Sequence, residues 1–446
     1  MNVPQEICNL VSAASSQYLI RFMLTPQITY YVDDGLVPED SLGPHTWLQM
    51  EHNSDESLRS LELTSKAFYR AICPCFQRKI SVTSRGSLGL LNKASQSPTI
   101  ANYVEILDIR VYDDLFSDQN TDFAMYINDL SNLVGFIGRF QNLRALALSY
   151  RRLCKDHGRD FMVGKVLARI IGVALRDWPN LKLNELVLDM PVNTNFWILF
   201  DDFLPSKADI KIDTQSSHTD CLSIIQHLRV QVREDGLILV EEEMPLDSNP
   251  VLSHAEYCLS MLINQLSNLD SLCINCDSIL SIYIPDGERM QNLQVLDLTR
   301  VRLSTRSLRH FTIFKDDQRL RSVSLEEVQL DVSRSRRSTA GWSFVFQSLV
   351  SSPHLGHLVV ESCGTYTQES GVSIGFISSS DASPYRKGDG FKELDLLLRH
   401  VARVRRKAKE SEQQKRREME AFPTSLTSPS DTIPGNWFAK QSEEML

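Results

Sequence analysis

A phrase of three apolar residues, in the order apolar-x-x-apolar-x-apolar, recurs eight times along the chain. Its last two positions alternate as they do in a short β-strand with one buried face, and the first can cover the core from the preceding loop. A unit this small cannot bury its apolar side alone, so the recurrence predicts a stack of similar units that share one core. The eight copies are Val104, Leu107, Ile109; Leu143, Leu146, Leu148; Leu183, Leu186, Leu188; Ile225, Leu228, Val230; Leu269, Leu272, Ile274; Leu293, Leu296, Leu298; Leu320, Val323, Leu325; and Leu355, Leu358, Val360.

The intervals between successive copies leave room for helices. Measured between central residues, they are 39, 40, 42, 44, 24, 27 and 35 residues long. Helical spacing of apolar residues predicts helices over 123–140, 161–178, 252–266 and 342–350. Parallel strands joined through such helices have right-handed crossovers. We therefore expect an α/β fold over residues 100–365, an irregular leucine-rich-repeat solenoid of parallel strands backed by helices. A generic α/β domain with leucine-rich strands is the alternative.

Residues 1–85 carry two pieces of a different pattern. The first is a short apolar helix with a proline near its start, and the second is a Leu-x-Leu-x-Ser-Lys-x-Phe run that continues to Pro74 and Ile80. Together they resemble an F-box, a small helical module that pairs with leucine-rich repeats notably in fungal proteins. The residues that match it, and that the resemblance implies for partner binding, are Val3, Pro4, Ile7, Leu10, Val11, Leu61, Leu63, Ser65 and Phe68.

The two pieces are separated by an insertion that F-boxes lack. Val11 and Leu61 lie 50 positions apart, and the insertion over 18–55 is rich in turn residues. From Asp33 to Glu56 it has seven acidic residues and no basic one, which is typical of a solvated loop. A segment interrupted in this way can also be a helical cap over the first repeat, because terminal repeats need covering.

The resemblance implies a function in protein binding. An F-box binds the linker (adaptor) subunit of a cullin-RING ubiquitin ligase of the SCF type, and the repeats then present a protein substrate. We expect this chain to be such a substrate-recognition subunit, with an apolar helix-in-groove contact to the linker. One alternative is a leucine-rich-repeat scaffold with no ubiquitin role, and a remote one is a serine hydrolase.

Motifs that suggest catalysis have simpler interpretations. Gly371 to Gly375 spells G-x-S-x-G around Ser373, but turn-rich residues follow where a nucleophile elbow needs a helix, so a loop is favoured. Cys273 and Cys276 form a C-x-x-C inside a repeat strand, without a second pair at zinc spacing, so we expect buried structural cysteines. His354 and His357 are expected at the surface. We therefore predict no enzymatic activity, no metal and no cofactor.

The remaining segments complete the expected organisation. Residues 366–390 are predicted as a loop, 391–420 as a capping helix with a basic end, and 421–446 as a disordered Ser/Thr/Pro-rich tail. The basic end suits either a nuclear-import or nucleic-acid patch or, more commonly, an ion-paired helix end. A net charge of −9 argues against nucleic acid as the main partner. With no signal peptide and no long apolar run in the sequence, we expect a cytoplasmic or nuclear protein without membrane contact.

Overall fold

The computed structural model describes the regular part of the chain. The described residues are 79–112, 120–132, 134–151, 157–177, 183–191, 222, 224–233, 254–266, 268–283, 290, 292–312, 319–331, 341–366, 373–377 and 391–421. The F-box-like segment up to residue 78, its insertion and the tail from 422 lie outside them. Contacts divide the chain into two compact units, Met1–Val401 and Ala402–Leu446, and the whole sheet belongs to the first.

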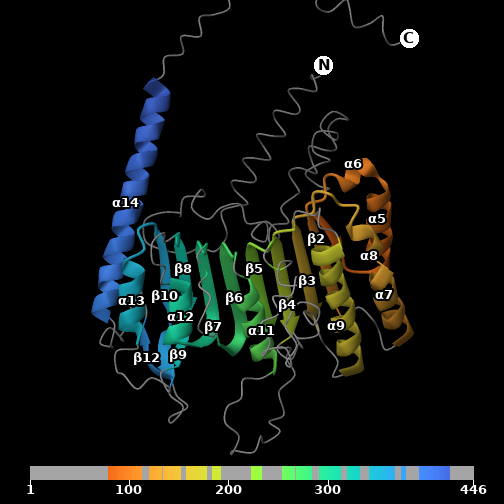
Figure 1. Cartoon of the computed structure of the whole chain (residues 1–446), viewed down its shortest axis with the longest axis horizontal. Coiled ribbons are helices and arrows are strands. Elements are labelled where there is room, and N and C mark those ends of the chain that lie inside the picture. The colour runs from red at the N-terminus through yellow and green to blue at the C-terminus, as the bar shows by residue number, and fades with distance from the viewer. Residues whose placement is uncertain are drawn as a thin grey trace, which may run out of the picture. The chain divides into compact units, whose positions relative to one another are not determined.

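One mixed α/β layer structure is built on a twelve-stranded sheet (Figure 1). Eleven strands are parallel, and β12 alone pairs antiparallel, with β11. The strands lie in sequence order from β1 to β7, after which β8 and β10 continue one half of the sheet and β9 and β11 the other. The strands are β1 Lys79–Val82, β2 Ile106–Tyr112, β3 Ala145–Arg151, β4 Glu185–Pro191, β5 His227–Arg233, β6 Ser271–Ile282, β7 Val295–Ser304, β8 Ser322–Glu326, β9 Gln329–Asp331, β10 His357–Glu361, β11 Cys363–Tyr366 and β12 Ser373–Ile377.

In all eight copies of the apolar phrase, the last two apolar residues lie on a strand, as predicted. The central residues are register partners from strand to strand, for example Leu107 with Leu146 and Leu146 with Leu186. All 24 apolar residues of the eight copies are at most 2% exposed, and all belong to one continuous core. The alternation in the sequence therefore corresponds to one buried face of the sheet.

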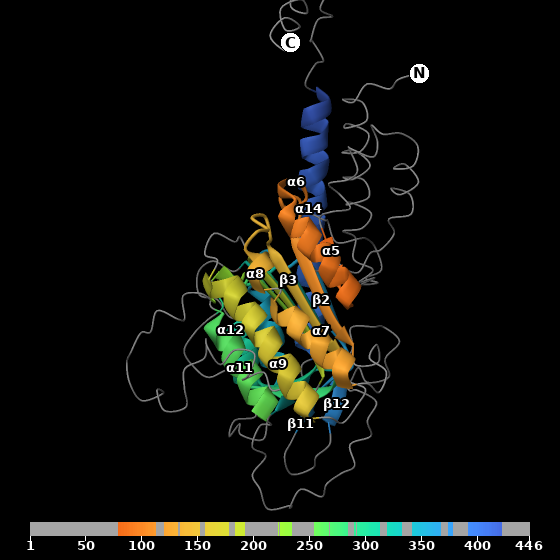
Figure 2. The same ribbon diagram turned by 90° about the vertical axis from the view of Figure 1, so that its right-hand side faces the viewer.

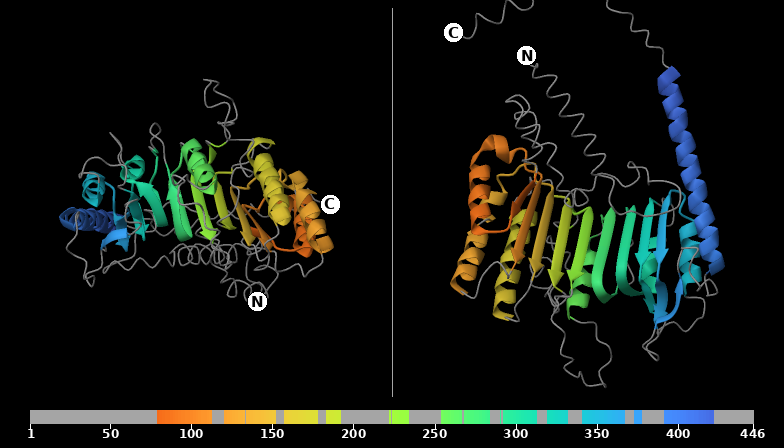
Figure 3. Two further views of the ribbon diagram at one scale, coloured as in Figure 1. Left: turned by 90° about the horizontal axis from the view of Figure 1, so that it is seen from below. Right: turned by 180° about the vertical axis from the view of Figure 1, so that it is seen from behind.

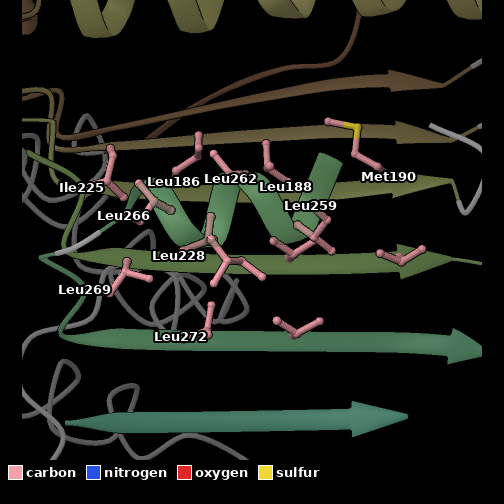
Figure 4. Packing of buried hydrophobic residues seen from close by; sticks show 14 of the residues in the cluster. Leu186, Leu188, Met190, Ile225, Leu228, Leu259, Leu262, Leu266, Leu269 and Leu272 are labelled. Carbon is pink, nitrogen blue, oxygen red and sulfur yellow. The ribbon is translucent and has the colours of Figure 1, made fainter. Parts of the chain in front are cut away.

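Helices cover that buried face (Figure 2). The structure has α5 Arg85–Gln96, α6 Pro98–Ala101, α7 Asn120–Asn132, α8 Val134–Ile137, α9 His157–Gly172 with the π-helical turn η3 Val173–Asp177, α11 His254–Gln265, α12 Thr305–Thr312, α13 Trp342–Val350 and α14 Phe391–Ala421. Figure 4 shows how α11 contributes: Leu259, Leu262 and Leu266 lie over Leu186 and Leu228 of two neighbouring strands. A helix packed across two strands in this way ties neighbouring units together.

A backbone motif repeats where each strand begins. The carbonyl oxygen of Glu105 accepts hydrogen bonds from the N–H groups of Arg144 and Ala145, at 2.9 and 3.0 Å. The same two-donor arrangement recurs at six further steps, up to the carbonyl of Arg321, which accepts from Gly356 and His357 at 3.0 Å each. Because both donors of each pair belong to the next unit, the starts of the strands are fixed at one level.

Three neighbouring units share a second backbone feature. Arg300, Glu327 and Ser362 have φ angles of 55°, 51° and 51°, in the left-handed region. They follow Thr299, Glu326 and Glu361, which are register partners. After these residues the chain returns to strand pairing: the end of β7 pairs with β9, and β9 pairs with β11.

Two expectations need correction. The end of the segment 1–85, expected to be helical, contains a strand, since Ile80, assigned there to the end of the F-box-like segment, lies in β1 opposite Leu107. The region 366–390, expected to be a loop, contains β12. In addition, the sequence pattern does not predict α5 and α12, because their apolar residues are few.

The four predicted helices are present, and the capping helix is α14. The helix expected over 123–140 is divided into α7 and α8. In the first turns of α14, Leu394, Leu397 and Val401 are buried in the common core. The ring of His400 lies 2.8 Å from the carbonyl oxygen of Ser352, through Nε2. This part of α14 therefore packs its apolar side chains into the common core.

Replacing one leucine of the phrase tests the shared core. Leu298→Ala is expected to lower the free energy of unfolding by about 2–5 kcal/mol, because Leu298 is fully buried and leaves a cavity. The neighbouring Thr299→Ala, on the other face of β7, should stay within about 0.5 kcal/mol of the parent. Urea unfolding of the full chain measures both. Equal losses would contradict the assignment of faces.

Ser362 tests the left-handed position. Ser362→Gly should be neutral or stabilise by up to about 1 kcal/mol, because glycine removes a side-chain clash of about 1–2 kcal/mol and costs about 0.4–1 kcal/mol in the unfolded chain. Ser362→Val should destabilise by more than about 1 kcal/mol, since a β-branched residue resists positive φ. Thr299→Val, in extended strand, is the control and should be tolerated. A Val variant at 362 as stable as the parent would disprove the backbone assignment.

Candidate functional site

The sheet face opposite the helices is the candidate site. We call it the open face, because no described helix covers it (Figure 3). Its side chains come from strand positions that alternate with the buried phrase, so they form rows across the strands. Its polar members include Lys79, Ser81, Asp108, Arg110, Ser149, Asp189, Arg229, Gln231, Arg233, Asn275, Asp297, Thr299, Arg302, Ser324, Glu326, Gln329 and Glu361.

Asp108 centres the first charge cluster of the open face. Its carboxylate lies 3.2 Å from Lys79 Nζ and 2.7 Å from Arg110 Nη2, and it accepts a hydrogen bond from the Ser81 hydroxyl at 3.2 Å. Burial alone would raise the pKa of this carboxyl. The hydrogen bond and charge of Arg110 and those of Lys79 outweigh burial and hold the pKa below its usual range. The acid therefore stays ionised and joins β1 to β2.

Two further acids are matched by a cation from a neighbouring strand. Arg233 Nε donates to Asp189 at 2.6 Å, and Arg300 donates to both carboxylate oxygens of Glu327 at 2.8 and 3.1 Å. The second pair joins two left-handed positions, and Arg300 Nη1 also donates to the carbonyl of Asp277 at 2.9 Å. Such partly exposed pairs add little stability, but they fix where the charges lie.

Glu326 and Glu361 differ from these matched acids. They are register partners on β8 and β10, and both are exposed on the open face. Burial of its carboxyl raises the pKa of Glu326, and the carboxylates of Glu361, Glu327 and Asp297 raise it further against the opposing charge of Arg300. Adjacent like charges are unfavourable, so this end of the open face holds excess negative charge.

Two serine–histidine pairs lie at the first row of the same face. His227 Nδ1 is 2.9 Å from Ser271 Oγ, and His357 Nδ1 is 3.0 Å from Ser322 Oγ. A catalytic serine is instead bonded to Nε2 of its histidine. All four side chains are buried, and the pairs recur at equivalent register positions, so they join strands. The expectation that His357 lies at the surface is wrong, because its hydroxyl partner satisfies Nδ1 in the interior; His354 is exposed as expected.

The cysteines of the C-x-x-C sequence are buried, as predicted. Three residues apart on one strand, Cys273 and Cys276 point to opposite faces. Cys273 Sγ donates to Asp297 on the open face at 3.6 Å, whereas Cys276 belongs to the core. Burial, with the nearby charges of Asp277 and Glu256, raises the pKa of Cys276 to about 12 and keeps it a thiol. Within the described part of the chain, no group of three His, Cys, Asp or Glu side chains is arranged to hold a metal ion.

Ser373 is the first residue of an antiparallel strand. Its register partner in β11 is Tyr366, and β12 runs on to Ile377. A nucleophile elbow instead places its serine in a sharp turn between a strand and a helix. The backbone at Ser373 therefore does not have the geometry that the G-x-S-x-G motif requires.

The residues predicted to bind a partner fall in the N-terminal segment. Val3, Pro4, Ile7, Leu10, Val11, Leu61, Leu63, Ser65 and Phe68 all lie outside the described residues. The motifs in the sequence do not single out the open-face residues, although a signal for them exists. They are the intervening positions of the phrase, such as Asp108, Arg229 and Asp297, which a period of two assigns to the opposite face.

The open face can bind by complementarity of shape and charge. Its acids and bases are held on strands rather than loops, so binding costs little conformational freedom.

Of the helices that the structure describes, none combines the length and apolar character needed to cross a membrane.

His227 predicts a pH dependence of stability. Burial, aided by the positive charge of Arg144, lowers the pKa of His227 to about 4. The fold therefore keeps the ring neutral. The contribution of this neutral ring to the free energy of unfolding is complete above the ordinary pKa of about 6.5. It is lost as the pH falls toward 4, by at most about 3 kcal/mol.

Urea midpoints between pH 7 and 4.5 measure this loss. His227→Gln keeps a hydrogen-bonding group for Ser271 but does not titrate, so its midpoint should fall less than that of the parent. His354→Gln, at an exposed histidine, is the control and should follow the parent. If the urea midpoints of His227→Gln and the parent fell equally with pH, the effect would be refuted.

Comparisons of the chain with protein-family models, with curated proteins and with solved structures find no match.

Proposed function

We propose that this chain is a protein-binding leucine-rich-repeat solenoid whose open face receives a partner protein. The observation that supports this most is the repeated two-donor hydrogen bond at seven consecutive strand steps. It places the first residues of successive strands at the same level of the sheet. Side chains from strands far apart in sequence therefore form continuous rows. Parallel strands backed by helices, with many polar side chains on the other face, suit binding of an extended protein surface.

We further propose that the chain is the substrate-recognition subunit of a cullin-RING ubiquitin ligase of the SCF type, active in the cytoplasm or nucleus. The proposal rests on the F-box-like residues, among them Pro4, Ile7 and Phe68, and on their position before the repeats. Since β1 begins at Lys79, a box ending near residue 78 would join the first strand directly.

A scaffold without a ubiquitin role is the second candidate, and one observation favours it. Ile80, the last residue of the F-box-like match, lies in β1 and packs against the core. Part of the match is thus explained by the first unit itself. In this alternative the preceding residues cover the β1 end of the array, as terminal repeats require.

Binding of the linker subunit separates the two candidates. The full chain should co-purify with the linker protein, and Ile7→Asp/Leu10→Asp should lose it, since two charges enter an apolar contact of the helix-in-groove type. We expect at least a tenfold weaker affinity, about 1.4 kcal/mol.

The matched control is Gln5→Asp/Asn9→Asp, which adds the same charge at positions that helical spacing assigns to the other face. It should bind as the parent does. A parent chain that does not bind the linker, while remaining folded by circular dichroism, would remove the ligase role and leave the scaffold.

A further inference from the structure

The open face is not equally exposed along its strands. We call the residues at which the strands begin the first row, and those four positions further along each strand the third row, about 13 Å away. Every member of the first row is at most 8% exposed: Ile106, Ala145, Glu185, His227, Ser271, Val295, Ser322 and His357. No member of the third row is buried: Arg110, Ser149, Asp189, Gln231, Asn275, Thr299, Glu326 and Glu361.

Burial of the first row requires a cover that the described elements do not supply. The described helices pack on the opposite face of the sheet (Figure 3). The turn residues that border the first row are themselves at least partly exposed, among them Asn184, Gln226 and Arg321. Glu185 and His357 are each only 1% exposed, and polar side chains of this size rarely lose all contact with water on an uncovered sheet face. Further chain therefore lies along the starts of the strands.

The stretch that precedes β1 is placed to form this cover. Lys79 is in register with the first row, so residues 1–78 enter the sheet at that level. They form the longest stretch outside the described residues. The first row crosses eight strands and spans about 34 Å, which about 23 helical residues would match. Of the other long stretches, 192–221 and 234–253 follow the far ends of β4 and β5, and 422–446 follows α14.

We infer that residues 1–78 fold back along the first row and cover it, which leaves the third row to a partner protein. The surfaces suit each other, because Ile106, Ala145 and Val295 give the first row apolar area. The stretch that precedes β1 offers Ile7 and Leu10, which helical spacing places on one face. This contact lies within one chain and needs neither the linker protein nor a substrate.

Photo-cross-linking in the full chain tests the cover. The photoreactive residue p-benzoylphenylalanine replaces Val187 or, in a second variant, Val359. Both valines lie on the open face between the first and third rows and are partly exposed. The excited ketone inserts into C–H bonds that it touches. After irradiation and digestion, mass spectrometry should find most cross-links from these positions in peptides of residues 1–78.

The control carries the same probe on the helix side. Met162 lies on α9 and is 40% exposed, and the probe there should give few cross-links to residues 1–78. Circular dichroism checks that each variant is folded, and a mixture of ¹⁵N-labelled and unlabelled chains separates cross-links within one chain from those between chains.

Three outcomes would overturn the inference. The probes at Val187 and Val359 could give no cross-link to residues 1–78 or link to another stretch of the chain. The control at Met162 could give the same yield as they do. The cross-links could join labelled to unlabelled chains, which would make a second copy the cover. Because no linker protein is present, these outcomes are independent of the ligase role.

Discussion

The whole sheet depends on the constraint that each strand must begin level with its neighbour. Backbone N–H groups that enter a buried sheet need acceptors, and here each pair of them finds one carbonyl in the preceding unit, from Glu105 to Arg321. A slip of one residue would turn the buried phrase to the open face and bring the polar rows into the core. The register that satisfies the backbone is therefore also the register that buries all 24 apolar residues.

The same constraint explains how the units can differ so much in length. Intervals of 24 to 44 residues separate strands that nonetheless pair in regular register. The variation is absorbed on the helix side, where the sixteen-residue α9 and the eight-residue α12 both place apolar side chains on the one core. The open face receives none of this irregularity, because only strand residues contribute to it. Strands separated by unequal lengths of chain can therefore present a regular surface.

How much of the fold the sequence predicts depends on how far apart in the sequence the interacting residues lie. Burial of every second residue is a local signal, so the pattern alone assigns Leu107, Leu272 and the rest of the phrase to the core. It does not predict the strand at Ile80, because Gln77 occupies the first position of that phrase. It misplaces His357, because the burial of this ring depends on Ser322, 35 residues earlier. The pairing of Glu326 with Glu361 needs the register of two strands, which the phrase implies only once parallel pairing is known.

The side chains that suggest chemistry are those the fold makes least reactive. Burial favours the thiol form of Cys276 and the neutral ring of His227, and Ser271 is fully buried against that ring. A nucleophile or proton carrier needs access to its reactant, and these three side chains are buried. The charged side chains of the open face are instead arranged in rows on strands, and several of them are paired locally. Glu326 and Glu361 are an exception among the acids of this face: they are register partners, and burial together with the neighbouring carboxylate of Glu361 raises the pKa of Glu326.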